Sequence, residues 1–317
     1  MGIKGSCNEV NSVFEQPWWL DIVAGSLWRE IIIQNKNGDC IGRLPYMYSK
    51  QKFMNLCTVP PLTQQVGPWI NVDSSMKRVA KLKHIKKVSE ELIDRLSHYE
   101  NVDLYFNKRY EYVLPFIWAG YSVEPRFTYV IDNLENLDLV KANMESKVRN
   151  LIKNAQKSIV VKDFISNDDL LRLLELTFAK QGRKLPLDKT MVVRLVRESV
   201  ERQSGKVFCA EDLSTGEAVA VAFFVYDKNT CYYLLGGRDY SSKICGCQEL
   251  LLWHGIQFAA TVSMEFDFEG SMIPGIESFF RGFGGNPRTY FRVYRGGIYF
   301  RFLNYLKPHI KKILNYK

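Results

Sequence analysis

The chain has 317 residues, of which 46% are hydrophobic and 24% are charged, and its net charge is +9. These proportions are typical of globular proteins and exclude a collagen-like or wholly disordered chain, and the length suffices for two ordinary domains. Because no apolar run reaches about 18 residues, we expect no transmembrane helix. The positive charge predicts a polyanionic partner, such as the phosphates of a cofactor, RNA or an anionic membrane.

The first half of the chain alternates predicted strands with one long helix. Pro17 suits the first position of a helix, and Asn37-Gly38 predicts a hairpin turn. Proline, glycine and glutamine are frequent between Thr58 and Trp69, which predicts an ordered loop. In chain order we expect a helix from residue 17, strands at 31–34 and 40–48, that loop, an amphipathic helix at 77–98, and strands at 102–106 and 127–131.

The polar stretch at residues 131–138 marks the predicted domain boundary, so we expect domains at 1–135 and 136–317. The second half repeats the order of elements found in the first half, which suggests a diverged internal duplication. Its expected elements are helices at 140–158, 168–180 and 187–202, strands at 207–211, 218–226 and 231–235, a helix at 246–260, a strand from 264, a short helix at 276–283 and a last strand.

Residues 264–269 alternate strictly between apolar and acidic side chains. This pattern places Glu265, Asp267 and Glu269 on one face of a strand. Gly270 and Pro274 then break the strand before a short helix. A row of carboxylates that ends at a glycine turn is typical of a cleft at a strand end, and an edge strand with one wet face is the alternative interpretation.

Two basic segments are candidates for contact with phosphates. Arg149, Lys153 and Lys157 lie on the polar face of the helix expected at 140–158, which suits tRNA or a pyrophosphate-bearing substrate, although a solvated face is the alternative. The C-terminal residues 299–317 are basic and rich in aromatic and aliphatic side chains. They predict either a helix docked on its domain or a contact with an anionic bilayer.

Cysteine usage indicates the redox state. Seven cysteines occur without the spacing of a disulfide framework, so we expect a reduced, cytoplasmic chain. Cys245 and Cys247 form a Cys-x-Cys pair and His254 follows, but a second pair of ligands at suitable spacing does not occur. We therefore interpret these cysteines as small buried thiols and expect no metal site.

Four segments occur in an order that resembles the Fem-type branch of the GNAT acyltransferases. They are LPYMYSK followed by PPLTQQVGPW, then KVRNLIKNAQKSIVV, YYLLGGRD and FDFEGSMIPGIESFFRGFGG. The resemblance covers nearly the whole chain and implies an α/β (α+β) fold of two tandem GNAT-like domains, each with a mixed, mainly antiparallel sheet flanked by helices. It implies a transferase that moves an acyl or aminoacyl group onto an amine of a cell-envelope precursor of peptidoglycan or polysaccharide, in the cytoplasm or at the inner face of the membrane.

The resemblance leaves the acyl donor open between aminoacyl-tRNA and acyl-CoA, neither of them a permanently bound cofactor. GNAT proteins that use acetyl-CoA carry a Q/R-x-x-G-x-G/A loop, whose backbone N–H groups bind the pyrophosphate. The corresponding residues here are Lys243, Gly246 and Gln248, so the second small residue is missing. Loss of this loop is expected of an enzyme that uses aminoacyl-tRNA.

Two other functions remain open on the sequence. One is an acyl-CoA-dependent N-acetyltransferase that acts on an amino sugar or another small amine. The other is a catalytically inactive GNAT pair that serves as an RNA- or membrane-binding module. Three acidic residues beside a basic surface favour an enzyme, because a module that binds polyanions has no use for them.

Acyl transfer to an amine needs a neutral amine and stabilisation of an oxyanion. The candidates are an acid as base or ammonium anchor, a tyrosine as proton donor, glycine N–H groups or Lys243 at the oxyanion, and an arginine for a phosphate or carboxylate. The candidate catalytic residues are Glu269, Asp267 and Tyr233, the cofactor-binding residues are Gly236, Gly237, Arg238, Lys243 and Gly246, and the substrate-binding residues are Arg149, Lys153, Lys157, Ser271 and Arg281.

Overall fold

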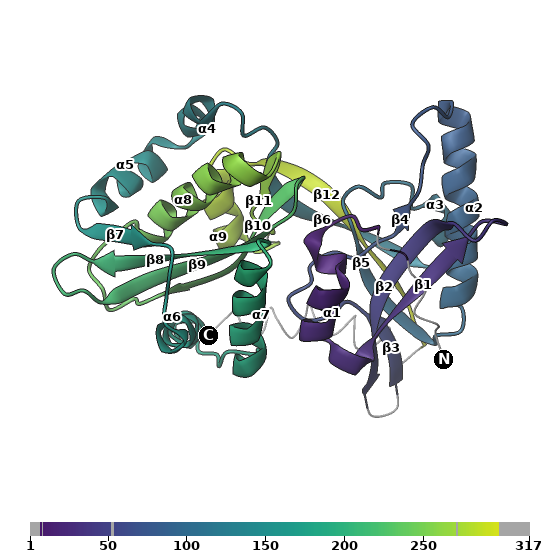
Figure 1. The fold of residues 1–317 in the computed structure, drawn as a ribbon, viewed down its shortest axis with the longest axis horizontal. Coiled ribbons are helices and arrows are strands. Elements are labelled where there is room, and N and C mark those ends of the chain that lie inside the picture. The colour runs from purple at the N-terminus through teal and green to yellow at the C-terminus, as the bar shows by residue number, and fades with distance from the viewer. Residues whose placement is uncertain (1–6, 8, 52–53, 271, 298–317) are drawn as a thin grey trace. The chain divides into compact units, whose positions relative to one another are not determined.

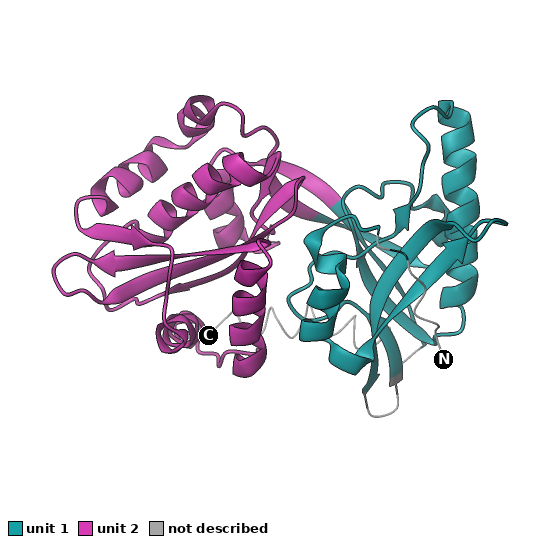
Figure 2. Cartoon of the chain, viewed as in Figure 1, with its two compact units in different colours: residues 1–126, 290–317 teal, residues 127–289 magenta. Residues whose placement is uncertain are grey.

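The computed structural model describes residues 7, 9–51, 54–270 and 272–297 (Figure 1). The chain divides into two compact units (Figure 2): the first comprises residues 1–126 and 290–317, and the second comprises residues 127–289. The sequence predicts a single cut after residue 135, whereas the chain crosses between the units twice. No described helix is long and apolar enough to cross a bilayer.

The first unit is built on a sheet with strand order β1-β2-β3-β5-β12, and β4 pairs with β2. Its long helix α2 buries Val88, Leu92 and Leu96 against this sheet, the spacing expected of one helix face. The elements are η1 (Val13–Glu15), α1 (Pro17–Val23), η2 (Gly25–Leu27), β1 (Trp28–Gln34), β2 (Cys40–Gln51), β3 (Met54–Thr58), β4 (Trp69–Ile70), α2 (Arg78–Leu96), β5 (Asn101–Phe106) and α3 (Leu114–Trp118). The hairpin predicted around Asn37-Gly38 is confirmed by the antiparallel pairing of β1 with β2.

The second unit has strand order β6-β11-β10-β9-β8-β7. Helices α5 and α8 cover one face of this sheet, and α6 and α7 cover the other (Figure 1). The elements are β6 (Ser122–Ile131), α4 (Leu137–Asn143), α5 (Ser146–Ala155), β7 (Ile159–Lys162), α6 (Asn167–Ala179), α7 (Lys189–Glu201), β8 (Gly205–Asp212), β9 (Ala218–Tyr226), β10 (Thr230–Arg238), α8 (Cys247–Val262), β11 (Glu265–Asp267) and α9 (Pro274–Arg281). The last strand, β12 (Asn286–Arg295), begins in this unit and pairs with β5 of the first.

The single helix predicted at 140–158 is wrong. Met144 and Glu145 adopt extended backbone angles, so the segment is divided between α4 and α5, and the strand β7 follows it. The guanidinium of Arg149 stabilises the break, because it donates to the carbonyls of Ala142 and Met144 at the end of α4. The apolar spacing continues through the break because Met144 and Val148 enter the same core.

The acidic strand is shorter than its pattern predicts. Only Glu265–Asp267 pair as β11, and Met264, which the alternation places on the apolar face, is 70% exposed. Asp267, expected on the wet face, is 1% exposed, because β11 lies between β10 and β6. An interior strand has two covered faces, so an acidic side chain there must find hydrogen-bond partners within the protein.

The cysteines differ in part from the sequence expectation of a reduced chain. Cys7 and Cys40 form a disulfide that joins the N-terminal segment to the start of β2. The other five described cysteines are free, and four of them are buried. Spacing could not reveal the bridge, because its two cysteines are 33 residues apart in sequence and only the fold brings their Cα atoms to 5.9 Å.

Candidate active site in the second unit

The centre of the second unit is a pair of strands that separate. β10 and β11 run parallel and pair at only three positions, from Thr230↔Glu265 to Tyr232↔Asp267. β10 then continues to Arg238 with β9 as its partner, and its register shifts between Tyr233 and Leu235. Separation of two parallel strands leaves one edge of β10 uncovered by β11, which creates room for a ligand inside an otherwise closed sheet.

A cavity of about 340 Å³ lies along this free part of β10. The first turn of α8 and one side of α9 complete its walls. Four residues expected to act at the site line it: Tyr233, Gly236, Gly237 and Arg238. The remaining lining residues are Thr177, Tyr240, Gln248, Glu249, Gly275, Ile276 and Phe279.

The two adjacent glycines of β10 have different roles in packing. A Cβ on Gly236 would lie 1.7 Å from the hydroxyl oxygen of Tyr233, so the tyrosine ring crosses directly over this glycine. A Cβ on Gly237 would lie 2.7 Å from the backbone of Leu173 in α6. Gly236 therefore admits the tyrosine to the cavity, and Gly237 admits the helix on the opposite side of the strand.

Tyr233 is held in place by Gln248. The amide Nε2 of Gln248 donates to the tyrosine hydroxyl at 2.9 Å and to the carbonyl of Val221 at 3.3 Å. Burial raises the pKa of Tyr233 well above its ordinary value near 10, although the bond from Gln248 acts in the opposite direction. The phenol is therefore protonated at neutral pH and can donate a proton or a hydrogen bond.

Three buried polar atoms in the walls of this cavity have no partner among the described residues. They are Oε1 of Gln248, Oε2 of Glu249 and Nε of Arg238. An unpaired buried polar atom costs about 1–3 kcal/mol, so proteins seldom bury one unless something else satisfies it. Two acceptors and one donor at one cavity indicate a site for a polar ligand.

The acidic residues lie in β11 and in the turn after it, and they do not line this cavity. The carboxylate of Asp267 accepts from the hydroxyl of Thr128 and from the backbone N–H of Glu269. Glu269 has a positive φ of 56°, which is unusual for a residue with a side chain and is often found at functional positions. Glu265 accepts from the hydroxyl of Thr230. The candidate Ser271 lies outside the described residues.

The candidate basic residues are spread over the surface of the second unit. Arg149 caps α4, and Lys157 donates to the side chain of Asn154 at 3.3 Å. Lys153 is exposed on the same helix, α5. Arg281 pairs with Glu277 at 3.1 Å and with Glu145 at 3.4 Å. The structure does not gather these side chains at the cavity.

Two candidate cofactor residues lie just before α8. Gly246 is the N-cap of the helix with a φ of 86°, and a Cβ there would lie 2.4 Å from the carbonyl oxygen of Leu151 in α5. Close packing of two helices therefore requires this glycine, whether or not a phosphate binds. Lys243 is exposed in the loop before it.

Sequence reasoning missed three residues at the cavity: Thr177, Gln248 and Glu249. The hydroxyl of Thr177 accepts the backbone N–H of Arg238 at 2.8 Å and so fixes the end of β10. Gln248 was considered only as the residue that breaks a phosphate-binding pattern. For Gln248 and Glu249 the available signal was their position in the first turn after a glycine, because that turn faces the end of the preceding strand in an α/β unit.

The comparisons with known proteins agree with this architecture. Residues 141–281 match the acetyltransferase (GNAT) domain family. Among solved structures, FemX is similar over 90% of this chain and 93% of its own, with a TM-score of 0.70 and 11% identity. The structure of L-PGS from Bacillus licheniformis is similar over 92% of this chain and 91% of its own, with a TM-score of 0.54 and 13% identity.

A third similar fold is the C-terminal domain of a putative lysylphosphatidylglycerol synthetase from Agrobacterium fabrum. The similarity extends over 84% of this chain and 84% of that one, with a TM-score of 0.53 and 11% identity. No curated protein sequence matches the chain. At these identities the structures establish the fold, and they confirm the tandem α/β architecture expected from the resemblance.

Proposed function

We propose that this chain, whose residues 141–281 match the acetyltransferase (GNAT) domain family and whose fold is similar to that of FemX, transfers an aminoacyl group from tRNA to an amine of a cell-envelope precursor. The observation that carries this proposal is the pair of unpartnered acceptors at the cavity, Oε1 of Gln248 and Oε2 of Glu249. A carboxylate and an amide oxygen suit the ammonium group of an aminoacyl donor, which has three N–H donors. An acetyl group offers them no hydrogen bond.

The reaction would use groups at the ends of both separated strands. The acceptor amine attacks the ester carbonyl, a C–N bond forms, and the C–O bond to the tRNA ribose breaks. Tyr233, a protonated phenol, would donate a proton to the departing ribose oxygen. Glu269, which follows β11 and does not line the cavity, stays the candidate base for the amine proton, and Asp267 accepts from its backbone N–H.

The tRNA and envelope assignments rest on charge and resemblance. The net charge of +9, the exposed Lys153 of α5 and the exposed Lys157 just after it are suited to a polyanionic donor. A similar fold belongs to a putative lysylphosphatidylglycerol synthetase, whose name describes an aminoacylated lipid. The Fem-type resemblance supports an amine of a cell-envelope precursor as acceptor.

Acyl-CoA-dependent N-acylation of a small amine is the second candidate. It is favoured by the left-handed Gly246 at the start of α8 and by Lys243 nearby, because a helix N-terminus with a basic side chain can receive a phosphate. Two observations weigh against it. Helix packing already requires a glycine at position 246. The phosphate-binding loop needs a second small residue at position 248, where this chain has Gln248, whose side chain bonds to Tyr233.

A donor comparison on the purified full chain tests the proposal. We expect radiolabel to pass from charged bulk tRNA to an amine-bearing envelope precursor, and none to pass from labelled acetyl-CoA. Glu249→Gln should lower kcat/KM for charged tRNA about 10- to 100-fold, the range for loss of one hydrogen bond to a charged group. Glu201→Gln, a matched change on exposed α7, should leave it unchanged.

Either of two results would contradict this function. Transfer from acetyl-CoA that is indifferent to Glu249→Gln would favour the acyl-CoA candidate. Binding of charged tRNA without transfer from either donor would favour an inactive binding module.

A further inference from the structure

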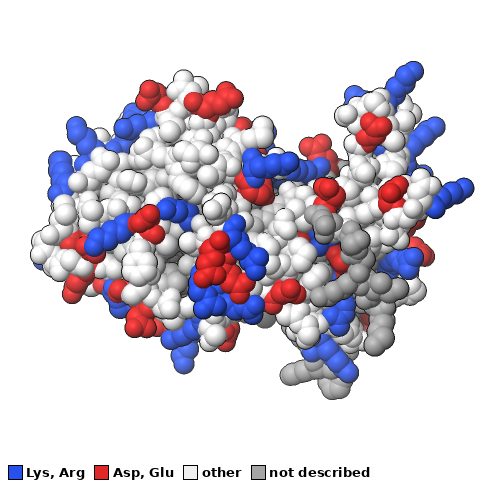
Figure 3. All heavy atoms as spheres, viewed as in Figure 1, with Lys and Arg blue, Asp and Glu red and all other residues white. Residues whose placement is uncertain are grey.

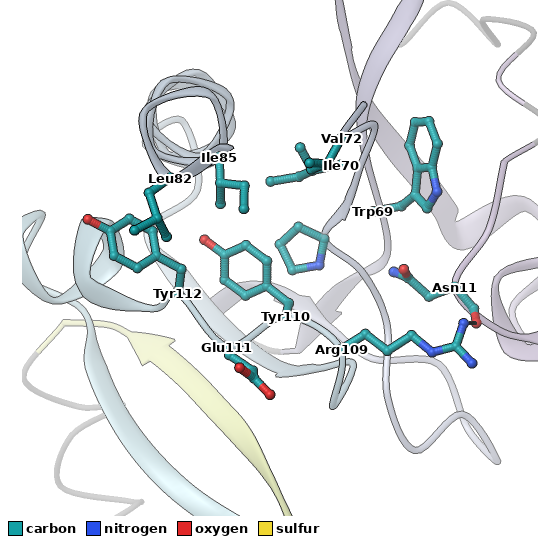
Figure 4. Close-up of a pocket in the computed structure, with 11 residues that line it drawn as sticks. Asn11, Trp69, Ile70, Val72, Leu82, Ile85, Arg109, Tyr110, Glu111 and Tyr112 are labelled. Atoms are coloured by element: carbon teal, nitrogen blue, oxygen red, sulfur yellow. Dashed lines mark hydrogen bonds between the residues drawn. The ribbon is translucent and has the colours of Figure 1, made fainter. Parts of the chain in front are cut away.

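A second cavity, of about 510 Å³, lies within the first unit (Figure 4). The segment that begins with β4, the loop after β5 and one side of α2 form its walls. Its two ends differ in chemistry. Leu82 and Ile85 of α2 are at one end, and Arg109 and Asn11 are at the other, beside Trp69 (Figure 4).

The wall between these ends is fixed by hydrogen bonds. Tyr110 is 6% exposed, and its hydroxyl bonds to the hydroxyl of Ser89 at 2.7 Å. Ser89 donates in turn to the carbonyl of Ile85 on the same helix. The ring of Tyr110 is therefore anchored to α2, and the cavity is formed before any ligand binds.

Arg109 has most of its donors available. Its guanidinium makes one hydrogen bond to a described residue, from Nη1 to the carbonyl of Asn11 at 3.4 Å, which is long. The side chain is exposed, and its backbone N–H is bound to the side chain of Asn107 at 3.0 Å. A guanidinium with a fixed backbone and free N–H groups is suited to a phosphate or carboxylate.

The apolar end opens onto an exposed apolar surface on the same unit. Val79 and Leu82 are 65% and 39% exposed and lie three residues apart on α2. Trp118 of α3 is 61% exposed, and Nζ of Lys86 lies 5.6 Å from its ring. Basic residues are frequent just before and along the first half of α2: Lys77, Arg78, Lys81, Lys83, Lys86 and Lys87. Figure 3 shows basic side chains that project from this unit.

We propose that this cavity binds an anionic amphiphile, with its apolar chain between Leu82, Ile85 and the residues of the β4 segment and its phosphate at Arg109. Exposed apolar side chains among lysines are typical of surfaces that meet anionic bilayers, so the amphiphile would be supplied from such a surface. The site lies in the first unit, and it stands or falls independently of the acyl-transfer proposal.

Calorimetry of the full chain with decyl phosphate, below its micelle concentration, tests the cavity directly. We expect saturable binding that Arg109→Gln weakens at least tenfold. Arg197→Gln, which removes an equal charge from α7, should leave it unchanged. The fluorescence change on titration should disappear in Trp69→Phe, because Trp69 lines the cavity. Arg109→Gln should melt at the same temperature as the wild-type chain, which would verify that the variant is folded.

Two further probes separate the sources of the ligand. Vesicles of phosphatidylcholine with phosphatidylglycerol should bind the chain, and Leu82→Asp together with Arg109→Gln should reduce that binding at least tenfold. Binding of decyl phosphate without vesicle binding would support the cavity and assign it a soluble amphiphile. AMP binding as tightly as decyl phosphate, or equal behaviour of Arg109→Gln and Arg197→Gln, would overturn the proposal.

Discussion

The two units contain the same pair of parallel strands, but the space beside the pair is occupied differently. In each, two parallel strands pair at three positions and are joined by a helix: β3 and β5 through α2, and β10 and β11 through α8. In the second unit the strands separate around a cavity. In the first, the chain after Thr58 returns beside β5, where Val66 donates to the carbonyl of Tyr105 at 2.8 Å and bridges to Phe106. The space beside the parallel strands is thus a cavity in the second unit and is filled by the chain's own backbone in the first.

A buried carboxylate holds the segment that returns beside β5 in the first unit. Glu15 is 0% exposed and accepts from the backbone N–H of Gly67 at 2.7 Å and from Asn11. Burial raises the pKa of Glu15, while its hydrogen bonds and Arg43 act in the opposite direction. The returning segment is therefore held by an internal group in the place where the second unit leaves its gap open to a ligand.

The largest effect should come from removing this support. Glu15→Ala leaves several buried donors unpaired, so we expect the free energy of unfolding to fall by about 3–5 kcal/mol, the range for breaking a buried charged contact. Urea denaturation measures it. Glu201→Ala, at an exposed position, should change stability by less than about 0.5 kcal/mol. Equal losses in both variants would contradict the structural role of the returning segment.

Replacing a glycine by alanine at the cavity of the second unit should lower activity at one position and not at another. Gly236→Ala would displace Tyr233, whose hydroxyl lies 1.7 Å from the new Cβ position, and we expect kcat/KM to fall more than about 100-fold. Gly275→Ala, at the same cavity, meets no atom within 4 Å and should retain activity. Equal kinetics in the two variants would remove Tyr233 from the mechanism.

A smaller effect is expected when only the tyrosine hydroxyl is removed. Tyr233→Phe keeps the ring but loses the proton donor and the bond from Gln248. We expect kcat to fall about 10- to 100-fold with KM nearly unchanged, at the lower end of general-acid effects because water can replace the hydroxyl. Steady-state kinetics separates the two constants. A rise in KM alone would indicate a binding role for the hydroxyl.

The buried tyrosines of the first unit should make the protein sensitive to alkali. Burial raises the pKa of Tyr121 to about 12 from its ordinary 10.0. Because the unfolded state loses this proton first, stability is complete below pH 10 and falls as the pH rises toward 12, by about 1 kcal/mol between pH 10 and 11. Urea denaturation at these two pH values should show a smaller loss for Tyr121→Phe, and an unchanged loss would refute the assignment.

Local chemistry explains which features the sequence could predict. Asn37-Gly38 identifies its hairpin, and the Gly236-Gly237 pair marks the strand whose end lines the cavity. Gln248 and Glu249 were missed, because position 248 was interpreted only as a departure from a phosphate-binding pattern. The interval 140–158 kept one apolar period across two helices, so periodicity alone could not locate the break at Met144.

The division of the chain into two units depends on strand pairing and cannot be predicted from local sequence. β6 passes from the first unit into the second and pairs with β11, and β12 returns to pair with β5. Two strands therefore span the points where the chain passes from one unit to the other. Composition at residues 131–138 marks a loop but does not reveal this exchange, because pairing partners are distant in sequence.

The most direct test of the account compares charged tRNA with the same tRNA after N-acetylation of its aminoacyl group, as donors for the full chain. The two donors differ in the ammonium group that Glu249 and Gln248 are proposed to bind. We predict that acetylation lowers kcat/KM at least tenfold and that Glu249→Gln removes most of this difference. Equal use of both donors by the wild-type chain would contradict the proposed role of the cavity.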